Sequence, residues 1–144
     1  MKKTGSRKNA RETAFKMIFQ MDVGKNTLSV AEETLNEAVA DGLVEERDRD
    51  YVLDLVAGVA EKKEETDAFM AKHAKGWTVD RINAVEKNLI RLALYEIFYL
   101  KEIPYEVSVN EAVELAKSYG DEDAYGFVNA VLDNARPEKR TGRN

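Results

Sequence analysis

The chain has 144 residues, 44 % of them apolar, which is enough for a folded core in one domain or two small helical halves. Cysteine is absent and histidine occurs once, so disulfides, thiolate chemistry and most zinc sites are excluded. No apolar run approaches the roughly 18 residues of a transmembrane helix, and the basic N-terminus leads into no apolar signal core, so we expect a cytoplasmic protein.

Charge is distributed unevenly along the chain, although its net value is only −5. Residues 1–21 carry six Lys or Arg against one Glu, and residues 136–144 carry four against one, whereas residues 22–135 hold 12 basic and 25 acidic side chains. A basic head and tail on an acidic body indicate a polyanionic partner such as nucleic acid. For the tail, an ordinary solvated end is the favoured interpretation.

The chain is predicted to be all helical, because it has only two prolines and no long stretch that alternates with the period of a strand. Apolar residues at helical spacing predict a first helix from near Ser6 to about Val23, ended by Gly24. A second helix is expected to start in the segment NTLSVAEETL, where Ser29 and Glu32 have the spacing of a capping box.

Gly76 separates the next two helical segments. Segment 45–74 is expected to break or bend near Glu64, and segment 77–104 has the strongest helical pattern of the chain, with its apolar residues on one side. This second segment must end before Pro104, because the residue that precedes a proline is driven out of the α region.

Glu96 is unusual, because its spacing places a carboxylate on the apolar side of that helix, where an unpaired charge is costly. A catalytic acid is one interpretation. The favoured one is structural: Glu96 accepts hydrogen bonds from backbone N–H groups near the start of the next helix, around Ser108. Ser108 and Glu111 have the spacing of another capping box, which predicts that this helix begins there and closes at Gly120.

A last helix, in the segment DAYGFVNAVLDNA, is predicted to pack its apolar residues inward: Val128, Val131, Leu132 and Ala135. The expected fold class is therefore all-α. The helices should form a compact bundle of about six or seven helices in two stacked halves, residues 6–75 and 77–136, within a single domain spanning 1–144.

The first helix combines basic and aromatic side chains. On a helical wheel Arg7, Lys8 and Arg11 border the apolar stripe, and Phe15 and Phe19 lie on the same flank. Phosphates bind Lys and Arg, and unstacked bases stack on flat rings, so this mixture suits single-stranded RNA. The alternative is that the two phenylalanines widen the core-facing side while the basic side chains are solvated. The charge pattern alone leaves both open.

Other candidate sites are weaker. His73 has no partner at metal-ligand spacing, and neither an acidic calcium loop nor a glycine-rich phosphate loop occurs, so no catalytic, cofactor or metal site is predicted. Phe127 follows the acidic turn between Gly120 and Gly126 and falls one step off the apolar stripe. It could stack on a base or close the end of the bundle.

Four stretches of the chain are typical of one known family: RETAFKMIFQ, DRINAVEKNLIRLALYE, IPYEVSVNEAVELAKSYG and FVNAVLD. In this order and spacing they resemble the NusB family of bacterial transcription antitermination factors, and the similarity covers roughly Arg7 to Pro137. The resemblance implies an all-α fold of two small helical bundles, with no catalysis and no cofactor.

For function, the resemblance implies binding to the single-stranded boxA element of ribosomal RNA leader transcripts, together with NusE, a small-subunit ribosomal protein. The complex helps RNA polymerase resist termination in ribosomal RNA operons. The family's RNA-binding positions map onto Arg7, Lys8, Arg11, Asp123 and Phe127, and its NusE-facing positions map onto Phe19 and Glu86. Because the segment SRKNAR has fewer arginines than the family often shows, RNA affinity without NusE is expected to be weak.

Two rival interpretations stay open at this point. RNA cytosine methyltransferases carry a NusB-like N-terminal domain, but this chain ends at Asn144, with no room for a cofactor-binding βαβ domain, and it has no glycine-rich methyl-donor loop. The other rival is a protein-binding helical scaffold, or a homodimer, that hides the basic first helix. The sequence does not decide between a monomer and a homodimer.

Overall fold

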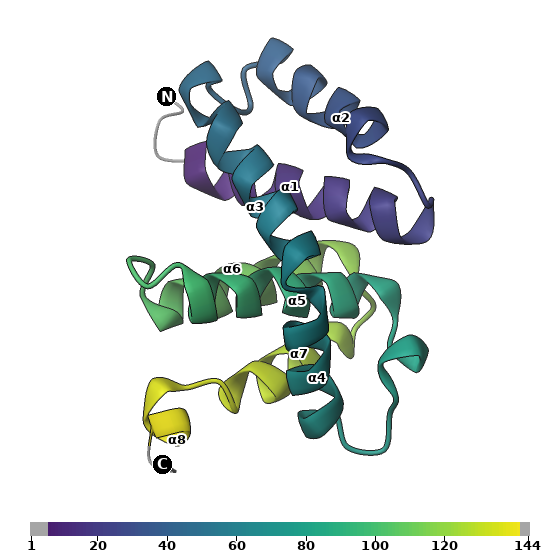
Figure 1. The fold of residues 1–144 in the computed structure, drawn as a ribbon, viewed down its shortest axis with the longest axis vertical. Helices are drawn as coiled ribbons and strands as arrows, with labels where there is room; N and C mark the ends of the chain where they lie inside the picture. The colour runs from purple at the N-terminus through teal and green to yellow at the C-terminus, as the bar shows by residue number, and fades with distance from the viewer. Residues whose placement is uncertain (1–5, 142–144) are drawn as a thin grey trace. The chain divides into compact units, whose positions relative to one another are not determined.

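The structure, a computed structural model, describes residues 6–141, and over this range it contains helices and connecting turns but no strand (Figure 1). The prediction of an all-α fold is confirmed. The helices follow the order α1 Ser6–Val23, α2 Leu28–Ala40, η2 Glu46–Asp48, α3 Arg49–Glu61, α4 Lys63–His73, η3 Val79–Arg81, α5 Ala84–Tyr99, α6 Tyr105–Tyr119, α7 Ala124–Asp133 and α8 Pro137–Thr141, where η marks a 3-10 helix. Within the described range, no helix is both long and apolar enough to cross a membrane.

The chain divides into two compact units, residues 1–60 and 61–144. The boundary lies at the end of α3, earlier in the chain than the seam expected at Gly76. The reason is that α4 contacts α5, so the helix before Gly76 belongs with the helices that follow it. A buried ion pair fixes this contact, because the Nε of Arg91 on α5 lies 2.8 Å from Oδ1 of Asp67 on α4.

In the first unit, α1 has the predicted bounds and packs against α2. Gly24 ends it, and its N–H donates to the carbonyl of Gln20 at 2.9 Å. The capping box predicted for α2 is wrong. Thr27 is the N-cap instead: its backbone is extended and its hydroxyl accepts from the N–H of Val30, so Ser29 already lies inside the helix.

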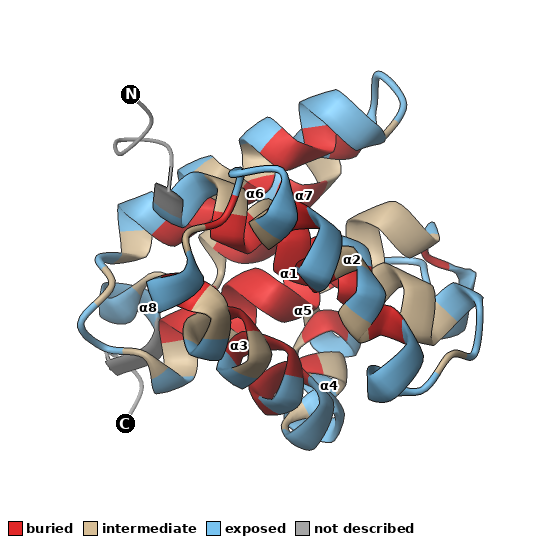
Figure 2. Ribbon diagram, turned by 90° about the horizontal axis from the view of Figure 1, so that it is seen from above, coloured by how far each residue is buried: buried red, intermediate tan, exposed pale blue. Residues whose placement is uncertain are grey.

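In the second unit, α5 is the central helix. Residues 88–94 are buried one after another, so the middle of α5 is enclosed on all sides, whereas the sequence pattern had predicted apolar residues on one side only (Figure 2). The reason is that α4, α6 and α7 all pack against it. The helix begins at Ala84, capped by the Asn83 side chain, which accepts from the Val85 N–H at 2.9 Å.

Helix α6 starts earlier than its predicted capping box. Pro104 is the N-cap, so Ser108 lies within the helix and caps nothing. Its hydroxyl instead donates to Oε1 of Glu96 on α5 at 2.7 Å, and Glu96 is 1 % exposed. The structural interpretation of Glu96 thus identified Ser108 correctly, although the Ser108 donor is its side-chain hydroxyl.

The link between α6 and α7 depends on a glycine. A Cβ placed on Gly120 would lie 2.4 Å from the Cβ of Ala124, far inside van der Waals contact. Glycine at this position therefore allows α7 to begin directly beside the end of α6. The apolar residues predicted to face inward from this last helix are all buried, and this part of the prediction is confirmed: Val128, Val131, Leu132 and Ala135.

Candidate nucleic-acid interface

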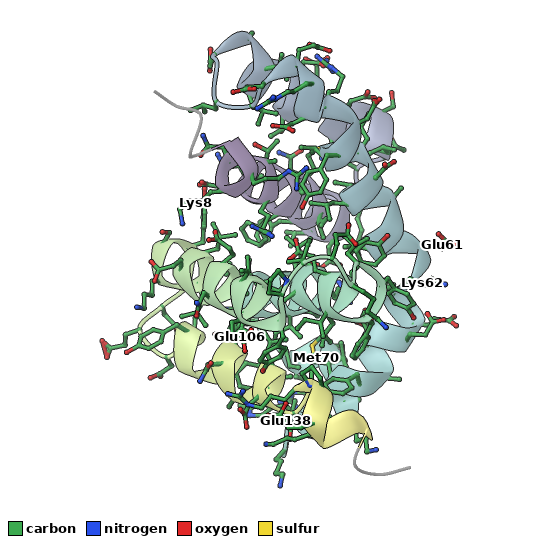
Figure 3. The ribbon with its side chains drawn as sticks, turned by 90° about the vertical axis from the view of Figure 1, so that its left-hand side faces the viewer. Lys8, Glu61, Lys62, Met70, Glu106 and Glu138 are labelled. Carbon is green, nitrogen blue, oxygen red and sulfur yellow. The ribbon has the colours of Figure 1, made fainter. Side chains whose placement is uncertain are left out.

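The basic residues at the start of α1 are presented to solvent. Arg7 and Lys8 are exposed, and the Lys8 side chain extends away from the N-terminal end of α1 (Figure 3). Lys2 and Lys3, which also belong to the basic head, lie outside the described residues. Exposed cations at one end of a helix are suited to contact phosphate groups, because ammonium and guanidinium groups donate strongly to phosphate oxygens.

A tyrosine from another helix holds Arg7. Its Cζ lies 3.8 Å from the ring centroid of Tyr51 on α3, the geometry of a cation–π contact. At an exposed site such a contact is worth about 0.5–1 kcal/mol. The contact restricts the guanidinium to one region of the surface, so less conformational entropy is lost when a phosphate binds it. This role of Tyr51 was not predictable from the sequence, since the two residues are far apart in the chain.

Arg11 differs from its two basic neighbours, because it is only 7 % exposed. Phe15, one turn further on, is 2 % exposed and belongs to the core. For Phe15 the alternative interpretation, a ring that widens the core-facing side, is therefore the correct one. Phe19 is half-buried, and its ring centroid lies 6.0 Å from that of Phe15. The open part of the basic flank thus consists of Arg7 and Lys8.

A second group of predicted residues gathers at the start of α7. Asp123 is the exposed N-cap residue, and its carbonyl accepts from the N–H of the half-buried Phe127 at 3.3 Å. The side chain of Asp121 stabilises this turn, because its Oδ1 accepts from the Asp123 N–H at 3.1 Å. Phe127 therefore lies on the first turn of α7, beside the turn that carries the carboxylates of Asp121 and Asp123, which we call the acidic corner.

Sequence reasoning missed an exposed aromatic at the same helix start. Tyr125 is 45 % exposed, and Nζ of Lys117, on the last turn of α6, lies 5.1 Å from its ring centroid. An exposed ring next to a cation combines a stacking surface with a phosphate donor. One signal was available: Tyr125, like Phe127, falls off the apolar stripe of this helix.

Glu86 joins the same acidic corner. It lies on the first turn of α5 and is half-buried, and its pKa is raised first by burial and then by the charges of Asp121 and Asp123. The sequence assigned Glu86 and Asp123 to different partners, whereas the structure brings them together. Carboxylates repel phosphate, so this corner is electrostatically suited to a basic protein or to the amino groups of bases.

The predicted residues thus form two groups, one in each unit. Arg7, Lys8, Arg11 and Phe19 lie on α1, and Glu86, Asp123 and Phe127 lie around the start of α7. Among the described residues, no three His, Cys, Asp or Glu side chains gather in an arrangement that could hold a metal ion.

Comparison with known proteins gives a consistent result. The model of the NusB family matches residues 8–137. A transcription antitermination protein NusB from Syntrophomonas wolfei is 40 % identical over 134 residues, which are 93 % of this chain and 98 % of that protein. The solved structure of T. maritima NusB aligns with a TM-score of 0.82 and 31 % identity, covering 92 % of this chain and 91 % of that one.

A further solved structure contains RNA. It is a crystal structure of the antitermination factors NusB and NusE in complex with double-stranded RNA. The matching chain aligns with a TM-score of 0.77 and 31 % identity, covering 94 % of this chain and 96 % of that chain.

Proposed function

The chain belongs to the NusB family, and from this premise we propose that it is a non-enzymatic transcription antitermination factor that binds RNA together with a NusE-type ribosomal protein. Its RNA target is the single-stranded boxA element of ribosomal RNA leader transcripts. The assembled complex acts on RNA polymerase in the cytoplasm and helps it to resist termination.

The observation that carries the proposal is the exposed pair Arg7 and Lys8 on the first turns of α1, with Arg7 fixed against Tyr51. These cations belong to a basic head on a chain whose residues 22–135 are strongly acidic. Acidic surfaces repel RNA from other faces and increase the rate of productive encounters at the basic end. We assign phosphate contacts to Arg7 and Lys8. Arg11, nearly buried, contributes mainly by holding α1 in place.

The second unit supplies the remaining roles. Phe127 stacks on a base at the first turn of α7, and Asp123 accepts from a base amino group beside it. Glu86 forms, with Asp121, an acidic surface that attracts the basic ribosomal-protein partner. Phe19, half-buried late on α1, adds apolar contact with the same partner.

The salt dependence of RNA binding tests the phosphate role. For single-stranded RNA, each lost phosphate contact lowers the slope of log affinity against log salt by about 0.7. Arg7→Ala should lower the slope by this amount, for a boxA oligonucleotide measured by fluorescence anisotropy with the NusE-type partner present. Lys16→Ala is the matched control, because Lys16 is exposed on the same helix but lies about half a turn around the axis from Arg7.

Three results would contradict the proposal. An unchanged slope for Arg7→Ala removes the phosphate contact. Equal retention of boxA and of a scrambled oligonucleotide reduces the function to generic RNA affinity. Tighter binding of a duplex than of the single strand overturns the choice of a single-stranded target. Sedimentation of the chain with and without RNA additionally tests the homodimer, because a dimer that covers α1 must dissociate when RNA binds.

A further inference from the structure

The second unit carries a cluster of cations of its own, far along the chain from the basic head. Lys72 and His73 are on the last turn of α4, Lys75 follows in the turn after it, and Lys139 is on α8. We call these four residues the α4–α8 basic corner. Lys72 and Lys75 are exposed, and the Lys139 side chain is 47 % exposed.

His73 lies on the same turn of α4 as Lys72. Its pKa is lowered first by burial and then by three charges, those of Lys72, Lys75 and Lys139. The three lysines therefore lie close enough to the ring to disfavour its protonated form. The ring itself is held in place, with its centroid 4.4 Å from that of Phe69 on the same helix.

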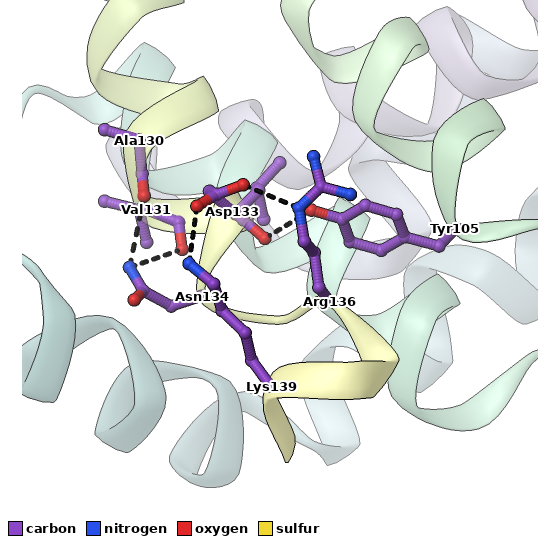
Figure 4. Close-up of polar contacts among 8 residues, drawn as sticks. Tyr105, Ala130, Val131, Asp133, Asn134, Arg136 and Lys139 are labelled. Atoms are coloured by element: carbon purple, nitrogen blue, oxygen red, sulfur yellow. Dashed lines mark hydrogen bonds and ion pairs between the residues drawn. The ribbon is translucent and has the colours of Figure 1, made fainter. Parts of the chain in front are cut away.

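Lys139 is fixed by an ordered network (Figure 4). Its Nζ lies 2.7 Å from Oδ2 of Asp133, and the other oxygen of this carboxylate accepts from Nε of Arg136 at 2.7 Å. Arg136 in turn lies over the ring of Tyr105, with its Cζ 5.3 Å from the centroid, and the Tyr105 hydroxyl donates to the carbonyl of Leu132 at 2.8 Å. One carboxylate is thus shared between two cations, and Glu138 on the first turn of α8 balances the remaining charge, so the uncompensated positive charge of the corner lies on Lys72 and Lys75.

An exposed indole adjoins the corner. Trp77, two residues after Lys75, is 53 % exposed. The turn that carries it is well defined, because the Trp77 N–H donates to the Ala74 carbonyl at 3.0 Å and Gly76 adopts a φ of 82°. A tryptophan of this exposure next to lysines provides both a stacking surface for a base and donors for the flanking phosphates.

We propose that the α4–α8 basic corner, together with Trp77, is a second contact surface for single-stranded RNA. This inference rests on the proposed RNA-binding function and extends it to a surface that lies in the other unit from Arg7. The ligand chemistry is a phosphodiester backbone with an unstacked base: Lys72 and Lys75 contact phosphates, and Trp77 stacks on the base. An acidic protein would also satisfy the lysines, but it would leave the exposed indole without a planar partner.

The chain has one histidine and one tryptophan, and both report on this surface without any mutation. The ring of His73, isotope-labelled, is titrated by NMR in the full chain alone and with a boxA oligonucleotide that retains its flanking leader sequence. Phosphates beside the ring favour the imidazolium form, so the pKa of His73 should rise by about 0.5–1 on binding. Emission from Trp77 should be quenched in the same titration.

Variants test the electrostatic contribution. Lys72→Gln combined with Lys75→Gln should lower the salt slope by about 1.4, twice the value for one phosphate contact. The matched control is Lys63→Gln combined with Lys101→Gln, two exposed lysines of the same unit that do not act on His73. The control should leave the slope unchanged.

The outcomes separate this inference from the function on which it rests. If anisotropy shows that RNA binds while His73 and Trp77 do not respond, the second surface is refuted and the proposed function stands. If no RNA binds at all, both are refuted. If an acidic peptide raises the pKa of His73 and RNA does not, the surface belongs to a protein partner and the inference is wrong.

Discussion

Loss of the Asp67 carboxylate should strongly destabilise the second unit. Arg91 on α5 is 5 % exposed and is held by Asp67 through two hydrogen bonds, of 2.8 Å from Nε and 2.9 Å from Nη2, while its Nη1 donates to the Asn88 side chain at 2.9 Å. Removing one partner of a buried ion pair leaves a buried charge without compensation, which costs about 3–5 kcal/mol. Because the Asp67 side chain is itself 23 % exposed, we expect Asp67→Ala to lower the free energy of unfolding by about 3 kcal/mol.

Urea unfolding, followed by circular dichroism and by the emission of Trp77 in the same unit, measures this loss. With the usual denaturant dependence of small proteins, the urea midpoint should fall by about 1–3 M. Asp133→Ala is the comparison, because its ion pairs with Arg136 and Lys139 are solvent-exposed and should be worth less than about 1 kcal/mol. A loss for Asp67→Ala that is no larger than this comparison would refute the reasoning. Combining Asp67→Leu with Arg91→Met should recover most of the stability, because the buried charge is then gone.

Four further predictions concern other parts of the molecule. Tyr51→Ala should weaken RNA binding about two- to fivefold by releasing Arg7, while Tyr51→Phe, which keeps a ring, should retain it; equal losses in both variants would exclude the cation–π contact. Gly120→Ala should reduce the free energy of unfolding by about 1–3 kcal/mol through overpacking, and an unchanged thermal midpoint would contradict this. Burial and neighbouring lysines lower the pKa of His73 below 6.5, so its protonation favours the unfolded chain. The free energy of unfolding should be full above pH 6.5 and fall as the pH drops through the lowered pKa. His73→Gln should remove this fall, measured as the urea midpoint at a series of pH values. Glu86→Gln should weaken capture by the NusE-type partner more at low salt than at high salt, and a salt-independent effect would argue against an electrostatic role.

Helices that are marked by the spacing of apolar residues and by a following glycine were predictable from the sequence, whereas the residues that cap them were not. The apolar stripe of α1 and the glycine after it fix both ends of that helix. The capping boxes at Ser29 and Ser108 were wrong because the same spacing of residues also fits inside a helix, and the true starts at Thr27 and Pro104 lie a few residues earlier. The enclosure of α5 was beyond the sequence pattern, because it depends on three other helices that pack around it.

In the candidate site, too, local features were predictable from the sequence and contacts between helices were not. The exposure of Arg7 and Lys8 agrees with the charge pattern. A helical wheel does not show which residues are covered by other helices, so it did not distinguish these two residues from the nearly buried Arg11. The proximity of Glu86 to Asp123 depends on how the start of α5 lies beside the start of α7, and no local pattern encodes this. The assignments of these residues to RNA and to a protein partner stay predictions.

The contact between Arg7 and Tyr51 couples ligand binding to the folding equilibrium. It joins the first turn of α1 to the first turn of α3, so the guanidinium is in its binding position only while both helices are formed. RNA that engages Arg7 therefore binds the native first unit in preference to the denatured chain. By mass action, saturation at a hundredfold excess over the dissociation constant adds about 2.7 kcal/mol to the free energy of unfolding. If RNA binds as proposed, a nascent transcript therefore stabilises the two helices that hold Arg7 in position.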